Sequence, residues 1–243
     1  MLSILLKLGL YGLIVFPIQM LPGPSQEFAK YIYVLAITGA TYTCAVAIRQ
    51  KDLKRIIAYS SVSHMCSVVV ALFSFRKAGL QAALYQGISH GFVSVALFIL
   101  VGYIYDRFGT RNLEKYGGIG RVMPYYTVFL LFFSLSNLAL PGLSSFVGEF
   151  GILFAVFSQS FVGGLVILVT VIVTGAYTLL LNNQVTFGNL QELTLVLLKD
   201  LNRREFYITL VLAFFVMVLG VYSDLIMPLF SDVASPTLGH IYY

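Results

Sequence analysis

Few ionisable side chains interrupt the long apolar runs of this sequence, and four of them are Lys7, His64, His90 and Glu149. An ionised group at the centre of a bilayer costs about 2.5–3.5 kcal/mol on insertion scales. Such residues usually face a bundle interior or water, and they often belong to a proton or ion path. Histidine titrates near neutral pH, which suits a proton relay. The four residues are therefore predicted to carry protons.

Each of the two histidines has a polar neighbour four residues earlier, Ser60 before His64 and Gln86 before His90. Residues four apart share a helix face, so the hydroxyl or amide can order water beside the imidazole. Two such faces on successive spans favour a relay over hydrogen-bonded structural histidines. No third ligand accompanies the pair, which argues against a metal site.

Lys7 and Glu149 each allow two interpretations. Lys7 is either a proton carrier or a lysine whose ammonium group snorkels to a nearby helix end. Glu149 follows Pro141 and Gly142, where a missing amide donor and a relaxed backbone predict a broken helix. A carboxylate beyond such a break can carry a proton or cap the second half-helix, and the two roles can coexist.

The composition is that of a membrane protein. The 243 residues are 59% hydrophobic and only 10% charged, with a mean hydropathy of +0.90. The apolar runs are long enough to span hydrocarbon, which takes about 20 residues per helix. A soluble all-helical protein would leave them unburied. The net charge of +5 comes from basic residues in the loops, which favours a positive-inside topology over nucleic-acid binding.

The apolar runs predict an all-α polytopic membrane fold with about seven transmembrane helices, one of them broken. The expected spans are about 2–20, 31–48, 56–74, 80–105, 123–157 with the break, 161–181 and 206–226. The segment from Leu190 to Leu201 is either an amphipathic helix on the inner membrane surface or a solvated connector.

The loops predict the orientation. Basic residues concentrate in loops 49–55, 106–121 and 182–205, which all fall on one side of the membrane. This side is expected to face inward, so the N-terminus lies inside and the C-terminus outside.

The run Asp52 to Met65 (DLKRIIAYSSVSHM) resembles the hallmark of a proton-conducting, antiporter-like membrane family. That family includes three large subunits of complex I and the multi-subunit sodium/proton antiporters. The stretches GISHG (87–91), LALPG (138–142) and FVGEF (146–150) follow in family order. The resemblance covers nearly the whole chain and is most specific over 49–155. Glutamate at the broken helix, together with LLKLG (5–9), is similar to the subunit 4 branch, because subunits 2 and 5 usually carry lysine at the break.

The resemblance implies a role for each candidate residue. Lys7 corresponds to the central bridging proton carrier, His64 and His90 to relay residues, and Glu149 to the terminal carrier. The order of the helices in the family also implies domains. Residues 1–30 match the eighth helix and an outer loop, and 31–182 match the second five-helix repeat. Residues 183–205 form an inner connector, and 206–243 hold the last helix and an outer tail.

The first repeat of the family has no counterpart here, and neither do its broken-helix lysine and the glutamate of the fifth helix. A companion chain is therefore expected to carry the N-terminal half of a split subunit.

The implied function is proton translocation in the membrane arm of NADH:ubiquinone oxidoreductase, at the mitochondrial inner membrane with the N-terminus in the matrix and the C-terminus in the intermembrane space. This chain should hold no cofactor, since flavin and iron–sulfur clusters belong to other subunits of the complex. Its expected partners are other membrane-arm subunits and bound lipids. Alternatives are a sodium/proton antiporter subunit, a bacterial or plastid relative, and a purely structural membrane component.

Overall fold

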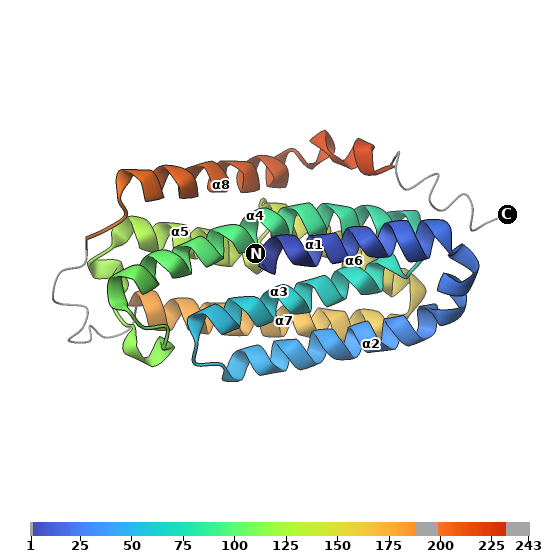
Figure 1. The fold of residues 1–243 in the computed structure, drawn as a ribbon, viewed down its shortest axis with the longest axis horizontal. Coiled ribbons are helices and arrows are strands. Elements are labelled where there is room, and N and C mark those ends of the chain that lie inside the picture. The colour runs from blue at the N-terminus through green and yellow to red at the C-terminus, as the bar shows by residue number, and fades with distance from the viewer. Residues whose placement is uncertain (1, 188–198, 232–243) are drawn as a thin grey trace.

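The structure, a computed structural model, describes residues 2–187 and 199–231, which form a bundle of roughly parallel and antiparallel helices (Figure 1). The α-helices are α1 (Leu2–Leu13), α2 (Pro22–Arg49), α3 (Leu53–Leu72), α4 (Lys77–Phe108), α5 (Pro124–Asn137), α6 (Ser144–Gln159), α7 (Phe161–Asn182) and α8 (Arg203–Val221). Two π-helical segments, η1 (Ile14–Met20) and η4 (Asn183–Phe187), extend α1 and α7. Short 3-10 turns lie at η2 (Leu113–Lys115), η3 (Ile119–Arg121) and η6 (Ser223–Leu225).

The expected membrane fold is confirmed. Among the described residues, five helices are long and apolar enough to cross a membrane: α2, α3, α4, α7 with η4, and α8. Shorter apolar helices run over Leu5–Met20 and Ser144–Gln159. One difference is that α2 begins at Pro22, well before the expected Tyr31. Proline is tolerated in the first turn of a helix because that turn has no internal partner for its amide.

The predicted broken helix is present between α5 and α6. Helix α5 ends at Asn137 and α6 begins at Ser144, with Pro141 in the intervening turn. Gly142 has a φ of +94°, a conformation that glycine adopts without strain. The break places the N-terminal turn of α6 inside the bundle, where its serines and Glu149 face α3 and α4.

A polar layer crosses the middle of the bundle between two apolar clusters. In α4, the layer around Gln86–His90 separates buried Leu80, Ala82 and Ala83 from the mostly apolar run 93–104. In α3, residues 60–64 belong to the same polar layer and separate Ile57 of one apolar cluster from Met65 of the other. The outer faces carry large exposed apolar side chains, as on α2 and α8. Polar groups inside and apolar groups outside are what a bilayer requires.

Helix α8 is fastened to the bundle by a largely buried ion pair. Arg107, near the end of α4, lies 2.5 Å from Glu205 in the first turn of α8, measured from Nη2 to Oε2. Arg107 also donates to the carbonyl oxygen of Lys199, and the Asp200 carboxylate accepts from the amide of Tyr125 at the start of α5. Residues 199–205 are thus tied to α4 and α5. Most of the segment predicted to be amphipathic lies outside the described residues.

We expect Arg107→Met to lower the thermal unfolding midpoint of the detergent-solubilised protein, at a cost near the lower end of about 3–5 kcal/mol, because it leaves Glu205 buried without a counter-charge. The double variant Arg107→Met/Glu205→Gln removes both charges and keeps a side chain that can cap α8, so it should lose less. Equal losses in the single and double variants would contradict this explanation.

Candidate functional site

The four ionisable candidates meet in the polar layer, although they come from four different helices: Lys7 from α1, His64 from α3, His90 from α4 and Glu149 from α6. Nζ of Lys7 lies 2.8 Å from Nδ1 of His90. Nδ1 of His64 lies 2.9 Å from Oε1 of Glu149. The two imidazole rings have centroids 5.4 Å apart. The groups therefore form one line in the order Lys7, His90, His64, Glu149.

Most of this line is shielded from outside the bundle. His90 is 2% exposed and Glu149 7% exposed, while Lys7 is partly buried. Nε2 of each histidine is buried and has no hydrogen-bond partner among the described residues. Buried polar atoms are nearly always partnered, so water is the expected partner here. Each imidazole therefore has one nitrogen bound to a charged neighbour and the other available to water.

The polar neighbours expected from the sequence take different positions in the structure. Gln86 was expected to support His90, but its amide donates to Oε1 of Glu149 at 3.3 Å. Ser60 was expected to support His64, but its hydroxyl donates to the Ile57 carbonyl and lines a separate small cavity. The position of a residue on a helix face fixes the direction of its side chain. Its hydrogen-bond partner depends on which neighbouring helix packs against that face.

The alternative interpretations of Glu149 and Lys7 find no support in the contacts. Glu149 lies beyond the first turn of α6, whose N-cap residue, Leu143, makes no side-chain cap. Its carboxylate instead contacts His64 and Gln86. The Lys7 ammonium is directed at His90 within the bundle. The structure thus partners Lys7 within this chain.

Several hydroxyl groups that the sequence analysis did not select complete the site. Ser89 on α4 donates to the Ser144 hydroxyl at 2.8 Å and lies 3.3 Å from that of Ser145, joining α4 to the start of α6. Thr170 and Thr174 on α7 line a cavity of about 10 Å³ next to His64 and Glu149. The sequence did carry a signal for the serines: Ser89 is next to His90, and Ser144 and Ser145 closely follow the proline–glycine break.

Gly148 sets the distance between α4 and α6 beside Glu149. A Cβ atom at this position would lie 2.8 Å from Cβ of Gln86 and 2.9 Å from its Cα. Real side chains do not approach backbone so closely, so only glycine allows this contact. The same close approach brings the Gln86 amide onto Glu149.

The site has the chemistry of proton transfer. Within the described residues, no group of three or more His, Cys, Asp or Glu side chains is arranged to hold a metal ion. What is present is an amine, two imidazoles and a carboxylate at or near hydrogen-bond distance, with hydroxyls around them. Such a line can exchange protons between neighbouring members.

Sequence comparisons match the chain to one family. Residues 1–178 match the family described as NADH:quinone oxidoreductase/Mrp antiporter, TM. The chain is 41% identical to NADH-ubiquinone oxidoreductase chain 4 of Marchantia polymorpha, over 98% of this chain and 48% of the relative. It is 38% identical to NADH-quinone oxidoreductase subunit M of Rhodobacter capsulatus, over 98% of this chain and 46% of the relative. The chain therefore spans about half the length of the curated relatives it matches.

Two solved structures share the fold of this chain. A chain of respiratory complex I from Thermus thermophilus with bound NADH superimposes with a TM-score of 0.91 at 26% identity, covering 96% of this chain and 49% of that one. A chain of the Mrp complex from Dietzia sp. superimposes with a TM-score of 0.84 at 18% identity, covering 96% and 51%. The second likeness concerns the fold alone.

We expect Gly148→Ala to destabilise the protein by about 1–3 kcal/mol, since the added methyl group meets the backbone of Gln86. The matched control is Gly102→Ala on α4, where an added Cβ meets nothing within 4 Å. Thermal unfolding in detergent should show a lower midpoint for Gly148→Ala and an unchanged or higher one for Gly102→Ala. Equal midpoints would show that this contact does not constrain the site.

Proposed function

The chain belongs to the NADH:quinone oxidoreductase/Mrp antiporter membrane family, and from this we propose that it acts in proton translocation, as a membrane-arm subunit of a respiratory NADH:quinone oxidoreductase or as part of one. The support is the close similarity to relatives named chain 4 and subunit M, and the fold shared with a complex I chain. The single observation that carries the mechanism is the line of four groups from Lys7 to Glu149.

The line can pass a proton with every atom accounted for. The Lys7 ammonium gives a proton to Nδ1 of His90, and His90 releases one from Nε2 to water. That water protonates His64 at Nε2, and His64 passes the proton on its Nδ1 to Glu149. Each imidazole ends neutral in its other tautomer and must be reset before the next proton. We propose that electron transfer in other subunits drives this cycle, with flavin and iron–sulfur clusters held there.

An antiporter complex is the second candidate function, because the Mrp chain shares the fold. That likeness is at 18% identity, whereas the relatives named as oxidoreductase subunits reach 38–41%. The comparison favours the oxidoreductase.

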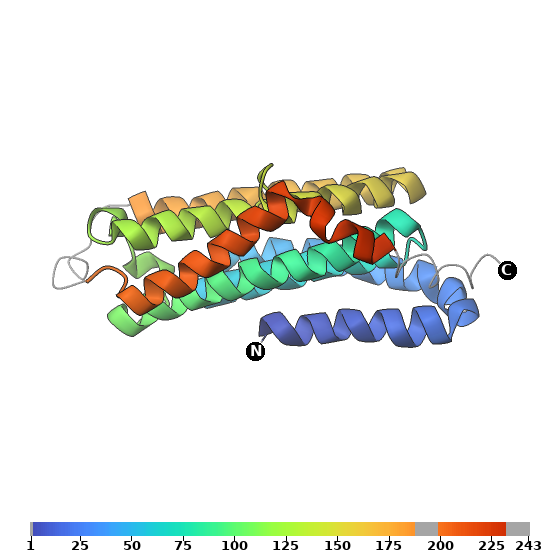
Figure 2. The same ribbon diagram turned by 90° about the horizontal axis from the view of Figure 1, so that it is seen from above.

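Location and partners follow as further parts of the proposal. We place the chain in the mitochondrial inner membrane with its basic loops in the matrix, supported by the charge distribution and by the likeness to a plant relative. Helix α1 lies at the edge of the bundle (Figure 2), and Leu5, Leu8 and Tyr11 on it are exposed. We propose that further helices of the subunit cover this face. They are the helices that the sequence analysis expects on a companion chain.

Glu149→Gln keeps size and hydrogen bonding but removes the charge, and Lys7→Met keeps length but removes the amine. Both should lower NADH-driven proton translocation and coupled quinone reduction in vesicles while leaving assembly intact. His64 and His90 variants should be more tolerant, because water can bridge a missing relay member. A normal proton-to-electron ratio in both the Lys7→Met and the Glu149→Gln complex would overturn the proposed roles.

Native purification through an affinity tag, followed by mass spectrometry, tests the assembly. We expect oxidoreductase subunits to co-purify, and a cysteine introduced at Leu8 to cross-link to a helix outside the present sequence. Recovery of antiporter subunits with no oxidoreductase subunits would show that the chain belongs to an antiporter complex instead. Lipid against the exposed face of α1 would contradict the proposed neighbouring helices.

A further inference from the structure

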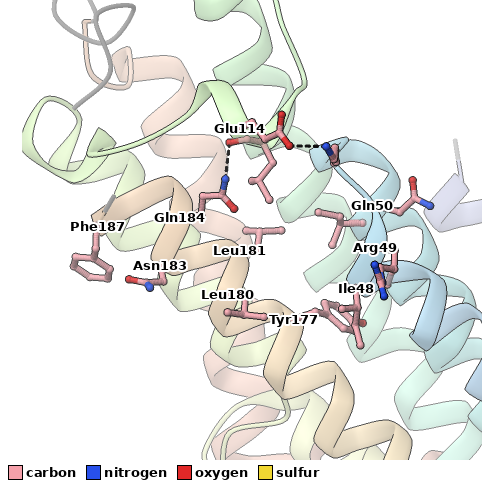
Figure 3. A pocket seen from close by; sticks show the side chains of 14 residues that line it. Ile48, Arg49, Gln50, Glu114, Tyr177, Leu180, Leu181, Asn183, Gln184 and Phe187 are labelled. Atoms are coloured by element: carbon pink, nitrogen blue, oxygen red, sulfur yellow. Dashed lines mark hydrogen bonds and ion pairs between the residues drawn. The ribbon is translucent and has the colours of Figure 1, made fainter. Parts of the chain in front are cut away.

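An open pocket of about 810 Å³ lies where the end of α2, the end of α7 and the turn η2 come together (Figure 3). Arg49, Lys51 and Glu114 lie around it, and Nζ of Lys51 is 2.7 Å from Oε1 of Glu114. The hydrogen bond from Lys51 lowers the pKa of Glu114, so this carboxylate is ionised at neutral pH. Charged and well exposed side chains at the rim place the pocket in contact with water on the side of the basic loops.

Tyr177 lies between this pocket and the interior of the bundle. Its side chain lines the open pocket, as Figure 3 shows, and it also lines a small cavity of about 20 Å³ with Ser60, Ser134 and Asn137. Tyr177 is 4% exposed, and its hydroxyl makes no hydrogen bond of good geometry to another described residue. The hydroxyls of Thr174 and Ser60 lie near it. A buried hydroxyl in this situation is expected to bind water.

A stripe of polar side chains continues from Tyr177 toward Glu149 along α7. Thr170, Thr174, Thr178 and Asn182 follow one another at intervals of four residues, and all are buried. Each threonine hydroxyl donates to a backbone carbonyl of its own helix, which leaves its oxygen able to accept from water. Thr174 and Thr170 also line the cavity of about 10 Å³ that contains His64 and Glu149.

The two small cavities are the right size for single waters. A cavity holds a water when about 10–15 Å³ is open to the centre of the water molecule and two to four polar partners surround it. The cavity beside Tyr177 exceeds this volume, and the one beside Glu149 reaches it. Hydroxyl and amide groups line both cavities, and the one beside Glu149 adds a carboxylate and an imidazole, so each offers polar partners to water.

We propose that the Tyr177 hydroxyl connects the open pocket to the His64–Glu149 pair through water in these two cavities, giving Glu149 a proton route to the basic-loop side that bypasses Lys7. The inference rests on the proposed function and adds a proton-relay residue to it. A proton passing this way binds the Tyr177 oxygen as the hydroxyl releases its own proton to the next water. The hydroxyl is neutral before and after the transfer.

Tyr126 supplies a matched control. It is fully buried in the apolar cluster and its hydroxyl also lacks a partner among the described residues, but it lines none of the three spaces on the route. In the assembled complex in vesicles, Tyr177→Phe should slow NADH-driven proton uptake from the basic-loop side several-fold and enlarge the rate difference between H₂O and D₂O. Tyr126→Phe should change neither. Equal behaviour of the two variants would overturn the role of the Tyr177 hydroxyl.

Access of water to the route can be measured without relying on pumping. In a Cys44→Ala/Cys66→Ala background, Thr178→Cys should react with silver ion added from the basic-loop side much faster than Val216→Cys, which is buried on α8 away from the route. Equal reaction rates would overturn the route. Normal pumping in both Lys7→Met and Glu149→Gln would instead overturn the proposed roles of the four-group line. Loss of pumping in Glu149→Gln, with Tyr177→Phe unchanged, would remove only the present inference.

Discussion

The structure depends on the need to keep an amine and a carboxylate partnered inside an apolar bundle. Lys7 and Glu149 are separated by two imidazoles, and each end group has a histidine within 3 Å. Moving one proton from Lys7 to Glu149 turns an ammonium and a carboxylate into a neutral amine and a neutral carboxylic acid. The net charge of the line does not change. The balance between these states is sensitive to outside charges, because a low-dielectric interior screens them weakly. This sensitivity is what an energy-coupled proton carrier requires.

The rest of the fold serves to hold that line together. The break at Pro141 turns polar residues at the start of α6 into the bundle, and Gly148 lets α6 approach α4 closely enough for Gln86 to reach Glu149. Apolar clusters lie on both sides of the polar layer.

Much of this arrangement could be predicted from the sequence. Hydropathy and proline gave the spans and the break, and the cost of burying charge selected Lys7, His64, His90 and Glu149. The pairings could not be predicted, because they depend on how helices distant in sequence rotate and pack. Gln86 on α4 contacts Glu149 on α6, and Ser60 points into a different cavity from His64. Tyr177 looked like one of many tyrosines, since its place between two cavities exists only in three dimensions.

The central claim is that the four groups exchange protons during turnover, and infrared difference spectroscopy of the working complex tests it most directly. Reduction by NADH should produce a change in the C=O stretching band of a protonated carboxyl group that disappears in Glu149→Gln and shifts when the solvent is D₂O. Lys7→Met should alter the same band, because it removes the other end of the line. A spectrum in which no carboxyl band depends on Glu149 would contradict the account and leave the line as a structural ion network.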